Sequence, residues 1–308
     1  MLHLKKILFP TDFSRCAEQA LAHAVFLAEK YDAEIHVLHV VTLFNDQPGI
    51  ISNEITETEE TIRKLEDIAE KHLNKVVDSK GSDDMKIITS TKREVSAAPA
   101  ILEYASDNNI DLIVMGTHGR RGLGHLLLGS AAEEVVRVAA CPVLTIRELK
   151  EPKPVMHVNN ILVPVDFSNY SKDTLAYASE IAQSYNAQLQ VLHIIEETMH
   201  PAFSLTGKSS IFDLIPGIED DCRKRTEKMV KDVVSKKIKT DIFIKGGSAA
   251  SDIIKFAKKN SADLIVIATH GLTGLEHMLL GSVTEKVVRM AHCPVFIVKA
   301  FGRSLISK

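Results

Sequence analysis

A spaced series of glycines offers the clearest chemistry in this sequence. Gly116 and Gly119 are followed, after nine residues, by Gly129 and Ser130 in the stretch DLIVMGTHGRRGLGHLLLGSAAEEVV. Glycines let the backbone come close to a ligand, and the exposed N–H groups at the start of a helix attract anions. Ser130 is suited both to donating to a phosphate oxygen and to capping the helix that begins here. The spacing therefore favours a phosphate-binding loop over a loop that only turns the chain.

Two better-known phosphate motifs do not describe this loop. The complete P-loop pattern, GxxxxGK followed by Ser or Thr, is absent from the sequence. The dinucleotide pattern GxGxxG fails because Gly122 and Gly124 are followed by Leu127 where the third glycine would stand. The loop is therefore expected to bind phosphate in another way.

The apolar run ILF at 7–9 is followed by the stretch Pro10–Ser14, which contains the carboxylate of Asp12. An aspartate at the end of a strand can accept hydrogen bonds from the hydroxyl groups of a ribose. The alternative role is structural, because Asp12 and Ser14 are both good capping residues before a helix that begins near Ala17. On these residues alone both roles remain open.

The chain is a tandem duplication. KKILFPTDFS near the start returns as NNILVPVDFS in the second half, and 111–146 matches 263–298 at more than half of its positions. The segment 148–158 between the copies has two prolines and mixed charge, which is typical of a short linker. We therefore expect one domain over 1–148 and a second over 158–308.

Short β-branched runs alternate in each copy with longer segments of helical period, a pattern that favours βαβ units. In the first copy, strands are predicted at 5–9, 34–41, 85–90, 111–116 and 143–147. Helices are predicted between them at 14–31, 54–79, 97–109 and 129–140. The fold class is therefore α/β, with two tandem open five-stranded parallel sheets and helices on both faces. Ligands of such sheets bind beyond the carboxyl ends of the strands, where the strand order reverses.

The composition is that of an ordinary globular protein, with 45% hydrophobic and 25% charged residues. No apolar run is long enough to span a membrane and the first residues lack the zones of a signal peptide, so we expect a cytoplasmic protein that does not bind membranes. The four cysteines form no CxxC pair and are expected to be reduced thiols. The net charge is −3 and there is no concentrated basic face, which argues against nucleic-acid binding.

Together these residues resemble the universal stress protein family in its tandem two-domain form. The shared features are the PTDFS and PVDFS strand ends, GTHG and ATHG after the fourth strand, the LLGS helix start, and the final CPVLTI and CPVFIV strands. The resemblance implies a Rossmann-like, adenine nucleotide alpha hydrolase-like fold that binds ATP, alone or with Mg²⁺. It implies a first site made of Pro10, Thr11, Asp12, Val40, Met115, Gly116, Gly119, Gly129, Ser130 and Ala131. It implies an equivalent second site made of Asp166, Ile194, Ile267, Gly271, Gly281, Ser282 and Val283.

The second copy departs from this pattern at Ala268, which stands where the first glycine is expected. Its methyl group would crowd a closely packed ribose. The first copy has an irregularity of its own, Val95 where the second has Gly247, which would narrow the adenine end of the site. We rank the first site above the second.

Three histidines recur at equivalent positions of the two copies. They are His39 with His193, His118 with His270, and His125 with His277. They lack a patterned carboxylate or cysteine partner, which favours structural or polar-contact roles over metal binding. No GxSxG nucleophile motif and no carboxylate pair of recognisable spacing occurs. Enzyme activity is therefore left open, and a slow ATPase is the most that we expect.

The leading hypothesis is an ATP-binding tandem stress protein that responds to the nucleotide by changing its conformation or its partners. The alternative belongs to another class: a nucleotide-free interaction or scaffold protein that uses the same fold. An enzyme that activates a substrate with ATP would need substrate residues that the sequence does not identify.

The two copies are also expected to dock as an internal pseudo-dimer. The last strands, 142–146 and 294–298, are short and apolar and need their edges covered. The linker is long enough for the copies to lie side by side, and the first copy is net acidic while the second is net basic. A homodimer of whole chains is compatible with the sequence, which gives it no specific support.

Overall fold

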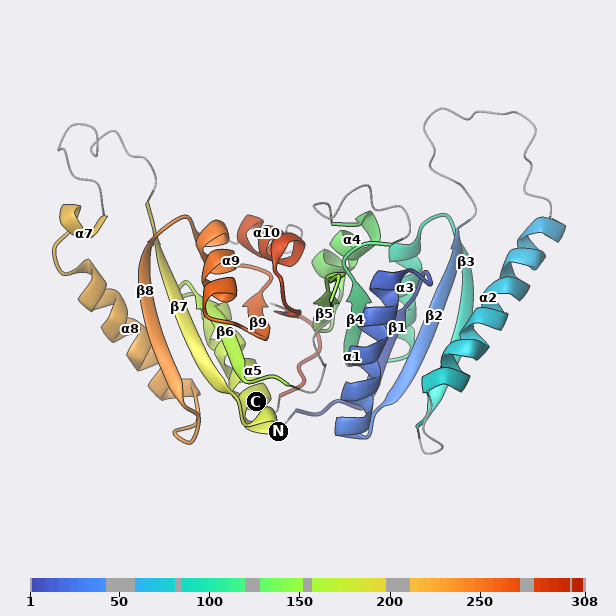
Figure 1. The fold of residues 1–308 in the computed structure, drawn as a ribbon, viewed down its shortest axis with the longest axis horizontal. Coiled ribbons are helices and arrows are strands. Elements are labelled where there is room, and N and C mark those ends of the chain that lie inside the picture. The colour runs from blue at the N-terminus through green and yellow to red at the C-terminus, as the bar shows by residue number, and fades with distance from the viewer. Residues whose placement is uncertain are drawn as a thin grey trace, which may run out of the picture. The chain divides into compact units, whose positions relative to one another are not determined.

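The chain folds into two compact units. One is Leu4–Pro152 and the other is Lys153–Lys308 together with Met1–His3, and we call them the N-terminal and C-terminal domains (Figure 1). The computed structural model describes residues 2–42, 59–80, 85–119, 128–151, 157–197, 211–271, 280–299 and 301–306. Each domain contains one copy of the duplicated sequence. The predicted boundaries at 148 and 158 stay a prediction.

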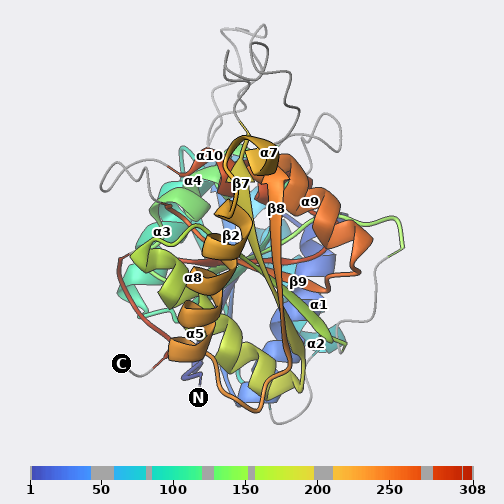
Figure 2. The ribbon, with the colours of Figure 1, turned by 90° about the vertical axis from the view of Figure 1, so that its left-hand side faces the viewer.

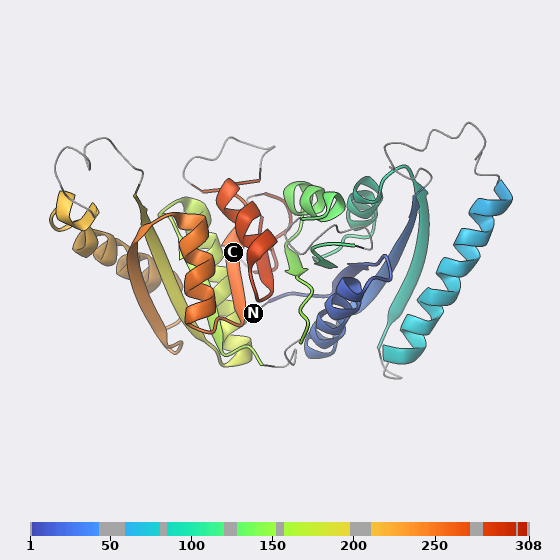
Figure 3. The same ribbon diagram turned by 45° about the horizontal axis from the view of Figure 1, so that its top comes forward.

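The N-terminal domain alternates strands and helices along the chain. Its elements are β1 (Lys6–Pro10), α1 (Arg15–Tyr31), β2 (Glu34–Thr42), α2 (Glu59–Lys80), β3 (Ile87–Glu94), α3 (Ala97–Asp107), β4 (Leu112–Gly116), α4 (Ser130–Val138) and β5 (Val143–Ile146). The strands lie in the order β3-β2-β1-β4-β5, and each neighbouring pair is parallel. Helices α1 and α2 pack on one face of the sheet and α3 and α4 on the other (Figure 3).

The C-terminal domain repeats this arrangement. Its elements are β6 (Asn160–Val165), α5 (Asn169–Tyr185), β7 (Gln188–Glu196), α7 (Ile211–Leu214), α8 (Ile218–Val233), β8 (Thr240–Gly247), α9 (Ala249–Lys259), β9 (Leu264–Ala268), α10 (Ser282–Met290) and β10 (Val295–Val298). The strand order is β8-β7-β6-β9-β10, again parallel throughout. Helices α5 and α8 lie on one face of this sheet and α9 and α10 on the other (Figure 2). Both domains thus have the predicted Rossmann-like α/β fold.

Burial explains why the strands read as continuous apolar runs. Ile7, Leu8 and Phe9 of β1 are at most 1% exposed, because helices cover both faces of the central strands. Strand β3 differs: it was predicted to end at residue 90, but it continues to Glu94. Its second half, TKRE, is polar because β3 lies at the end of the strand order and, among the described strands, pairs with β2 alone. The apolar pattern therefore stops before the strand does.

A buried polar network that was not predicted from the sequence lies at the start of β2. His36 is 3% exposed and lies between Tyr104 and Glu34, with Nδ1 at 2.9 Å from the Tyr104 hydroxyl and Nε2 at 3.0 Å from Glu34 Oε1. Because a carboxylate only accepts, the His36 Nε2–H donates to Glu34, and Nδ1 shares a hydrogen bond with the Tyr104 hydroxyl. Glu34 also contacts the ammonium groups of Lys86 and Lys6.

We predict that Glu34 stabilises the protein in a pH-dependent way. The Lys86 and His36 hydrogen bonds lower the pKa of Glu34 from 4.5 to about 2. Since the folded-state pKa lies below the unfolded value, the contribution is complete above about pH 4.5 and is lost as the pH falls from 4.5 towards 2. Glu34→Gln should lower the free energy of unfolding by about 1–2 kcal/mol at pH 7, and the difference from the wild type should shrink in acid. Urea unfolding at pH 7, 4 and 3 measures this, and parallel curves for the two proteins would contradict it.

Candidate functional site

The carboxyl ends of β1 and β4 lie side by side where the strand order reverses, and a tight turn there positions Asp12. Asp12 Oδ1 accepts the Ser14 amide at 3.0 Å, and Thr11 Oγ1 accepts the Phe13 amide at 3.0 Å. The helix cap itself is Ser14, whose side chain accepts the Ala17 amide. Asp12 therefore supports the turn through one oxygen and lines a pocket at the same time.

Phe13 holds this turn in an unusual backbone conformation, with a φ of 60°. Its ring stacks on His39 of β2 at 4.6 Å and also lies 5.1 Å from the ring of His72 on α2. The Thr11 carbonyl accepts a hydrogen bond from His39 Nδ1 at 2.7 Å. His39 therefore fixes the backbone directly before Asp12, which is a positioning role.

The C-terminal domain builds the same turn. Phe167 has a φ of 66°, and the centre of its ring lies 4.2 Å from that of His193, with the two rings tilted by 39°. His193 Nδ1 donates to the Val165 carbonyl at 2.9 Å, and burial lowers the pKa of His193. The repeated strand-end histidine thus has the same structural task in both domains.

Two of the three spaced glycines pack closely against other residues of the domain. A Cβ atom at Gly119 would lie 2.3 Å from Asp12 Oδ2, and one at Gly116 would lie 2.8 Å from Cys16 Sγ. Gly129 is different: a Cβ atom there would make ordinary contacts, 3.4 Å from the Thr117 carbonyl oxygen, and its φ of −66° suits any residue. The packing therefore does not require a glycine at position 129, which is the N-cap of α4, where glycine is one of the common residues.

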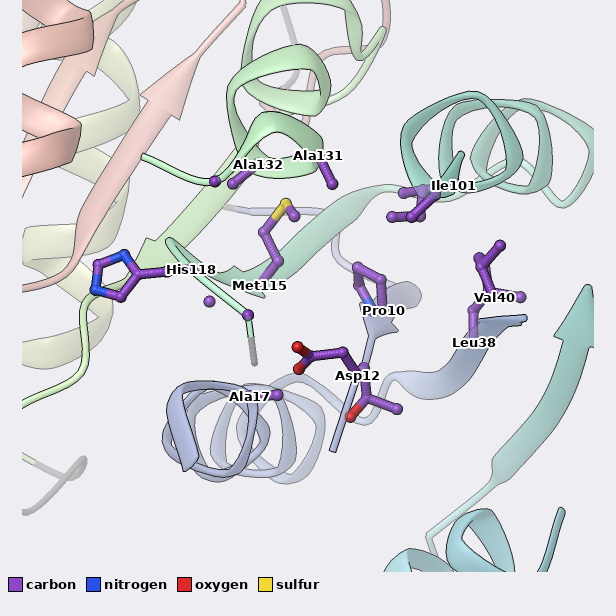
Figure 4. A pocket seen from close by; sticks show the side chains of 15 residues that line it. Pro10, Asp12, Ala17, Leu38, Val40, Ile101, Met115, His118, Ala131 and Ala132 are labelled. Carbon is purple, nitrogen blue, oxygen red and sulfur yellow. The ribbon is translucent and has the colours of Figure 1, made fainter. Parts of the chain in front are cut away.

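These residues surround a pocket in the N-terminal domain (Figure 4). Its empty space is about 600 Å³, open mouth included. The predicted first-site residues that line it are Pro10, Thr11, Asp12, Val40, Met115, Gly116, Gly119, Gly129 and Ala131. Ser130, the remaining one, is the exposed first residue of α4 and is not a lining residue.

The pocket has an apolar end and a polar end. Leu38, Val40 and Ile101 lie together at one end, whereas Asp12 and His118 lie towards the other (Figure 4). The lining residues that were not predicted are Ala17, Leu38, Ala97, Ile101, His118 and Ala132. Most of them are small or aliphatic, so their residue types alone carry no signal of binding.

The predicted second-site residues occupy the corresponding places of the C-terminal domain. Asp166 follows β6, Ile194 and Ile267 lie in β7 and β9, Gly281 precedes α10, and Ser282 and Val283 open that helix. A Cβ atom at Gly271 would lie 2.3 Å from Asp166 Oδ2, as at Gly119. Ala268 ends β9 as Gly116 ends β4.

The expected effect of Val95 needs correction. Strand register pairs Gly247 with Glu196 and Glu94 with Thr42, so Glu94, not Val95, corresponds to Gly247. Val95 is one extra residue before the Ser96 cap of α3, is 63% exposed, and is not among the lining residues of the pocket. The predicted narrowing of the adenine end by Val95 is therefore wrong.

Some sequence features fall outside the described residues. They include Gly122, Gly124, His125 and His277. So does the tripeptide Gly207, Lys208 and Ser209, which resembles the end of a P-loop but has Ala202 in place of its first glycine.

Within the described ranges, no cluster of three or more His, Cys, Asp or Glu side chains is placed to hold a metal ion. No helix in the same ranges is both long and apolar enough to cross a membrane.

Comparison with known proteins gives consistent matches over both copies. The model of the universal stress protein family matches residues 3–147 and 157–299. A universal stress protein of Methanocaldococcus jannaschii is 36% identical over 142 residues, covering 45% of this chain and 81% of that protein. One of Mycolicibacterium smegmatis is 23% identical over 306 residues, covering 95% of this chain and 96% of that protein.

The fold agrees with these matches. The crystal structure of a universal stress protein from Archaeoglobus fulgidus has a TM-score of 0.71 to this chain at 21% identity, and the likeness covers 96% of this chain and 98% of that one. The two family matches span both domains, including the Asp12 and Asp166 turns and the glycines that follow β4 and β9. The chain belongs to the universal stress protein family, with two copies of the family's domain in tandem.

Proposed function

We propose that the N-terminal domain binds ATP in the pocket at the ends of β1 and β4. The observation that carries this proposal is Gly129, a glycine that the fold does not require but that lines the pocket at the start of α4. A ligand that presses against the backbone there explains the absence of a side chain. The amides at the start of α4 attract anions, and the phosphate groups of ATP are anions.

The rest of the pocket suits a nucleotide. The apolar end, with Leu38, Val40 and Ile101, would hold the flat base, and the Asp12 carboxylate would accept the ribose hydroxyls. Gly119 and Gly129 would leave room for the phosphates, and the Ser130 hydroxyl would donate to one of them. If Mg²⁺ accompanies ATP, it would be held mainly through phosphate oxygens and water. The protein then acts as a nucleotide-responsive stress protein.

A thermal test separates this proposal from a nucleotide-free scaffold protein. A ligand that binds the folded state raises the melting temperature, and at about one hundred times its Kd it adds about 2.7 kcal/mol. Millimolar ATP should therefore raise the melting temperature, and acid precipitation of the purified protein should release adenine nucleotide. Absence of both effects would favour the scaffold role.

The phosphate assignment predicts the effect of a single substitution. Gly129→Val should lower ATP affinity at least about tenfold, equal to about 1.4 kcal/mol, because a branched side chain would occupy the phosphate position. The melting temperature of the free protein should fall only modestly, since a Cβ atom has ordinary space here and the remaining cost is that valine is a poorer N-cap than glycine. Titration calorimetry measures the affinity, and Gly281→Val is the parallel variant in the C-terminal domain, where a Cβ atom would lie closer to a backbone oxygen, 3.1 Å from that of Thr269. Unchanged ATP binding by Gly129→Val would refute the assignment.

Two further expectations stay predictions. One is docking of the two copies as an internal pseudo-dimer, which small-angle scattering on the monomeric fraction tests: a compact profile supports it and an extended, bimodal distance distribution opposes it. The other is a cytoplasmic location.

A further inference from the structure

We propose that the C-terminal domain does not bind nucleotide, and that Ser171 is the residue that most directly prevents it by holding the Asp166 carboxylate. The chain would then carry one ATP, in the N-terminal domain. This inference rests on the proposed function, in which Asp12 accepts hydrogen bonds from the ribose hydroxyls of ATP. Asp166 would not accept them in the same way.

The Asp166 carboxylate is engaged by its own chain. Asp166 Oδ1 accepts the Ser168 hydroxyl at 2.6 Å, the Ser171 hydroxyl at 2.7 Å and the Ser168 amide at 3.1 Å. The Ser171 oxygen in turn accepts the Asp166 amide at 2.9 Å. Both serines are buried, with 8% and 4% exposure for Ser168 and Ser171. Three donors saturate Oδ1, so a ribose, which offers two hydroxyls, would meet at most one accepting oxygen of this carboxylate, Oδ2, instead of two.

The N-terminal domain lacks this arrangement because of one residue. Ser14 and Ser168 are equivalent helix caps, each accepting the amide three residues later. That later residue is Ser171 in the C-terminal domain but Ala17 in the N-terminal domain, where it lines the pocket. Alanine has no hydroxyl, so position 17 offers the Asp12 carboxylate no such donor. The surroundings of the two aspartates thus differ by one hydroxyl group, which Ser171 has and Ala17 lacks.

The other positions that line the N-terminal pocket also tend to carry larger residues in the second copy. When the fifteen lining residues of the N-terminal pocket are matched to the second copy, five positions gain atoms and none loses a heavy atom. The larger residues are Ser171 for Ala17, Ile194 for Val40, Ala268 for Gly116, Val283 for Ala131 and Thr284 for Ala132.

One of these changes adds a second internal hydrogen bond. Thr284 is 4% exposed, and its hydroxyl donates to the Ala268 carbonyl at 2.7 Å. Both enlarged residues that carry a hydroxyl, Ser171 and Thr284, therefore bond to their own domain. The second copy therefore combines larger wall residues with hydroxyl groups that bond within their own domain.

Reciprocal substitutions test the inference by titration calorimetry with ATP. The wild type should bind one ATP per chain. Ala17→Ser should weaken that site about tenfold by capturing Asp12, whereas Ala17→Cys, which adds similar bulk but only a weak donor, should weaken it less. The triple variant Ser171→Ala, Ala268→Gly and Thr284→Ala should raise the stoichiometry to two. Melting temperatures without ATP show whether each variant is folded.

The outcomes separate the two proposals. A wild type that binds no ATP would refute the proposed function and this inference with it. Two equivalent sites in the wild type would leave the proposed function standing and overturn the inference. One wild-type site, with Ala17→Ser unchanged or equal in effect to Ala17→Cys, would overturn the role given to the Ser171 hydroxyl.

Discussion

Gly119→Val is expected to lower the affinity for ATP by about one hundredfold, which corresponds to the loss of about 2.7 kcal/mol of binding free energy. The reason is the close packing of Gly119 on the proposed ribose acceptor. A Cβ atom at position 119 would lie 2.3 Å from Asp12 Oδ2, so the carboxylate or the loop must move. Loss of a charged acceptor and displacement of the phosphate loop act on the same ligand. Titration calorimetry on the full chain measures the effect.

The tandem chain supplies its own control for this substitution. A Cβ atom at Gly271 would lie at the same 2.3 Å from Asp166 Oδ2, so Gly271→Val introduces an equivalent clash in the C-terminal domain. If the N-terminal domain carries the nucleotide, Gly271→Val should leave most of the ATP bound while destabilising the chain to a similar extent. Equal losses of binding from the two variants would show two equivalent sites and contradict the ranking.

The sequence predicted the polar part of the pocket better than its apolar wall. Asp12, Gly119 and Gly129 were found because a strand-end carboxylate and spaced glycines are unusual enough to suggest chemistry. Ala17 and Ala132 were missed because alanine has no chemical signature, and their place in the wall depends on how α1 and α4 turn towards β1 and β4. The contrast with Ser171 and Thr284 became informative only once these positions were known to face the pocket.

The limits of the fold prediction have a similar origin. Buried strands such as β1 and β4 could be located because their apolar runs are continuous. The end of β3 and the Glu34–His36–Tyr104 network could not, since both consist of polar residues whose burial depends on tertiary partners. Tyr104 lies far along the chain from His36, so no local spacing connects them.

A recurring aspartate before the fourth strand of each copy also escaped the sequence interpretation. Asp111 is 5% exposed, and its Oδ2 accepts the amides of Lys5 and Lys6 at 2.9 and 3.0 Å. Asp263 Oδ2 accepts the amides of Asn159 and Asn160 in the same way, both at 3.1 Å. The sequence DLIV occurs at this strand in both copies, so the repeated aspartate was visible. The sequence does not indicate which backbone amides such an aspartate binds.

Asp111→Ala is expected to lower the free energy of unfolding of the N-terminal domain by about 2–4 kcal/mol, because two partly buried amides lose their acceptor, at about 1–2 kcal/mol each. The register between β1 and β4 pairs only Ile7 with Leu112 and Leu8 with Ile113, so the aspartate extends a short contact between two central strands. Hydrogen exchange should therefore accelerate in residues 5–9 and not in 159–163, and Asp263→Ala should reverse that pattern. Asp111→Asn, which keeps one side-chain carbonyl oxygen as an acceptor, should be destabilised less. Unchanged exchange of residues 5–9 in Asp111→Ala would show that Asp111 does not anchor the start of β1.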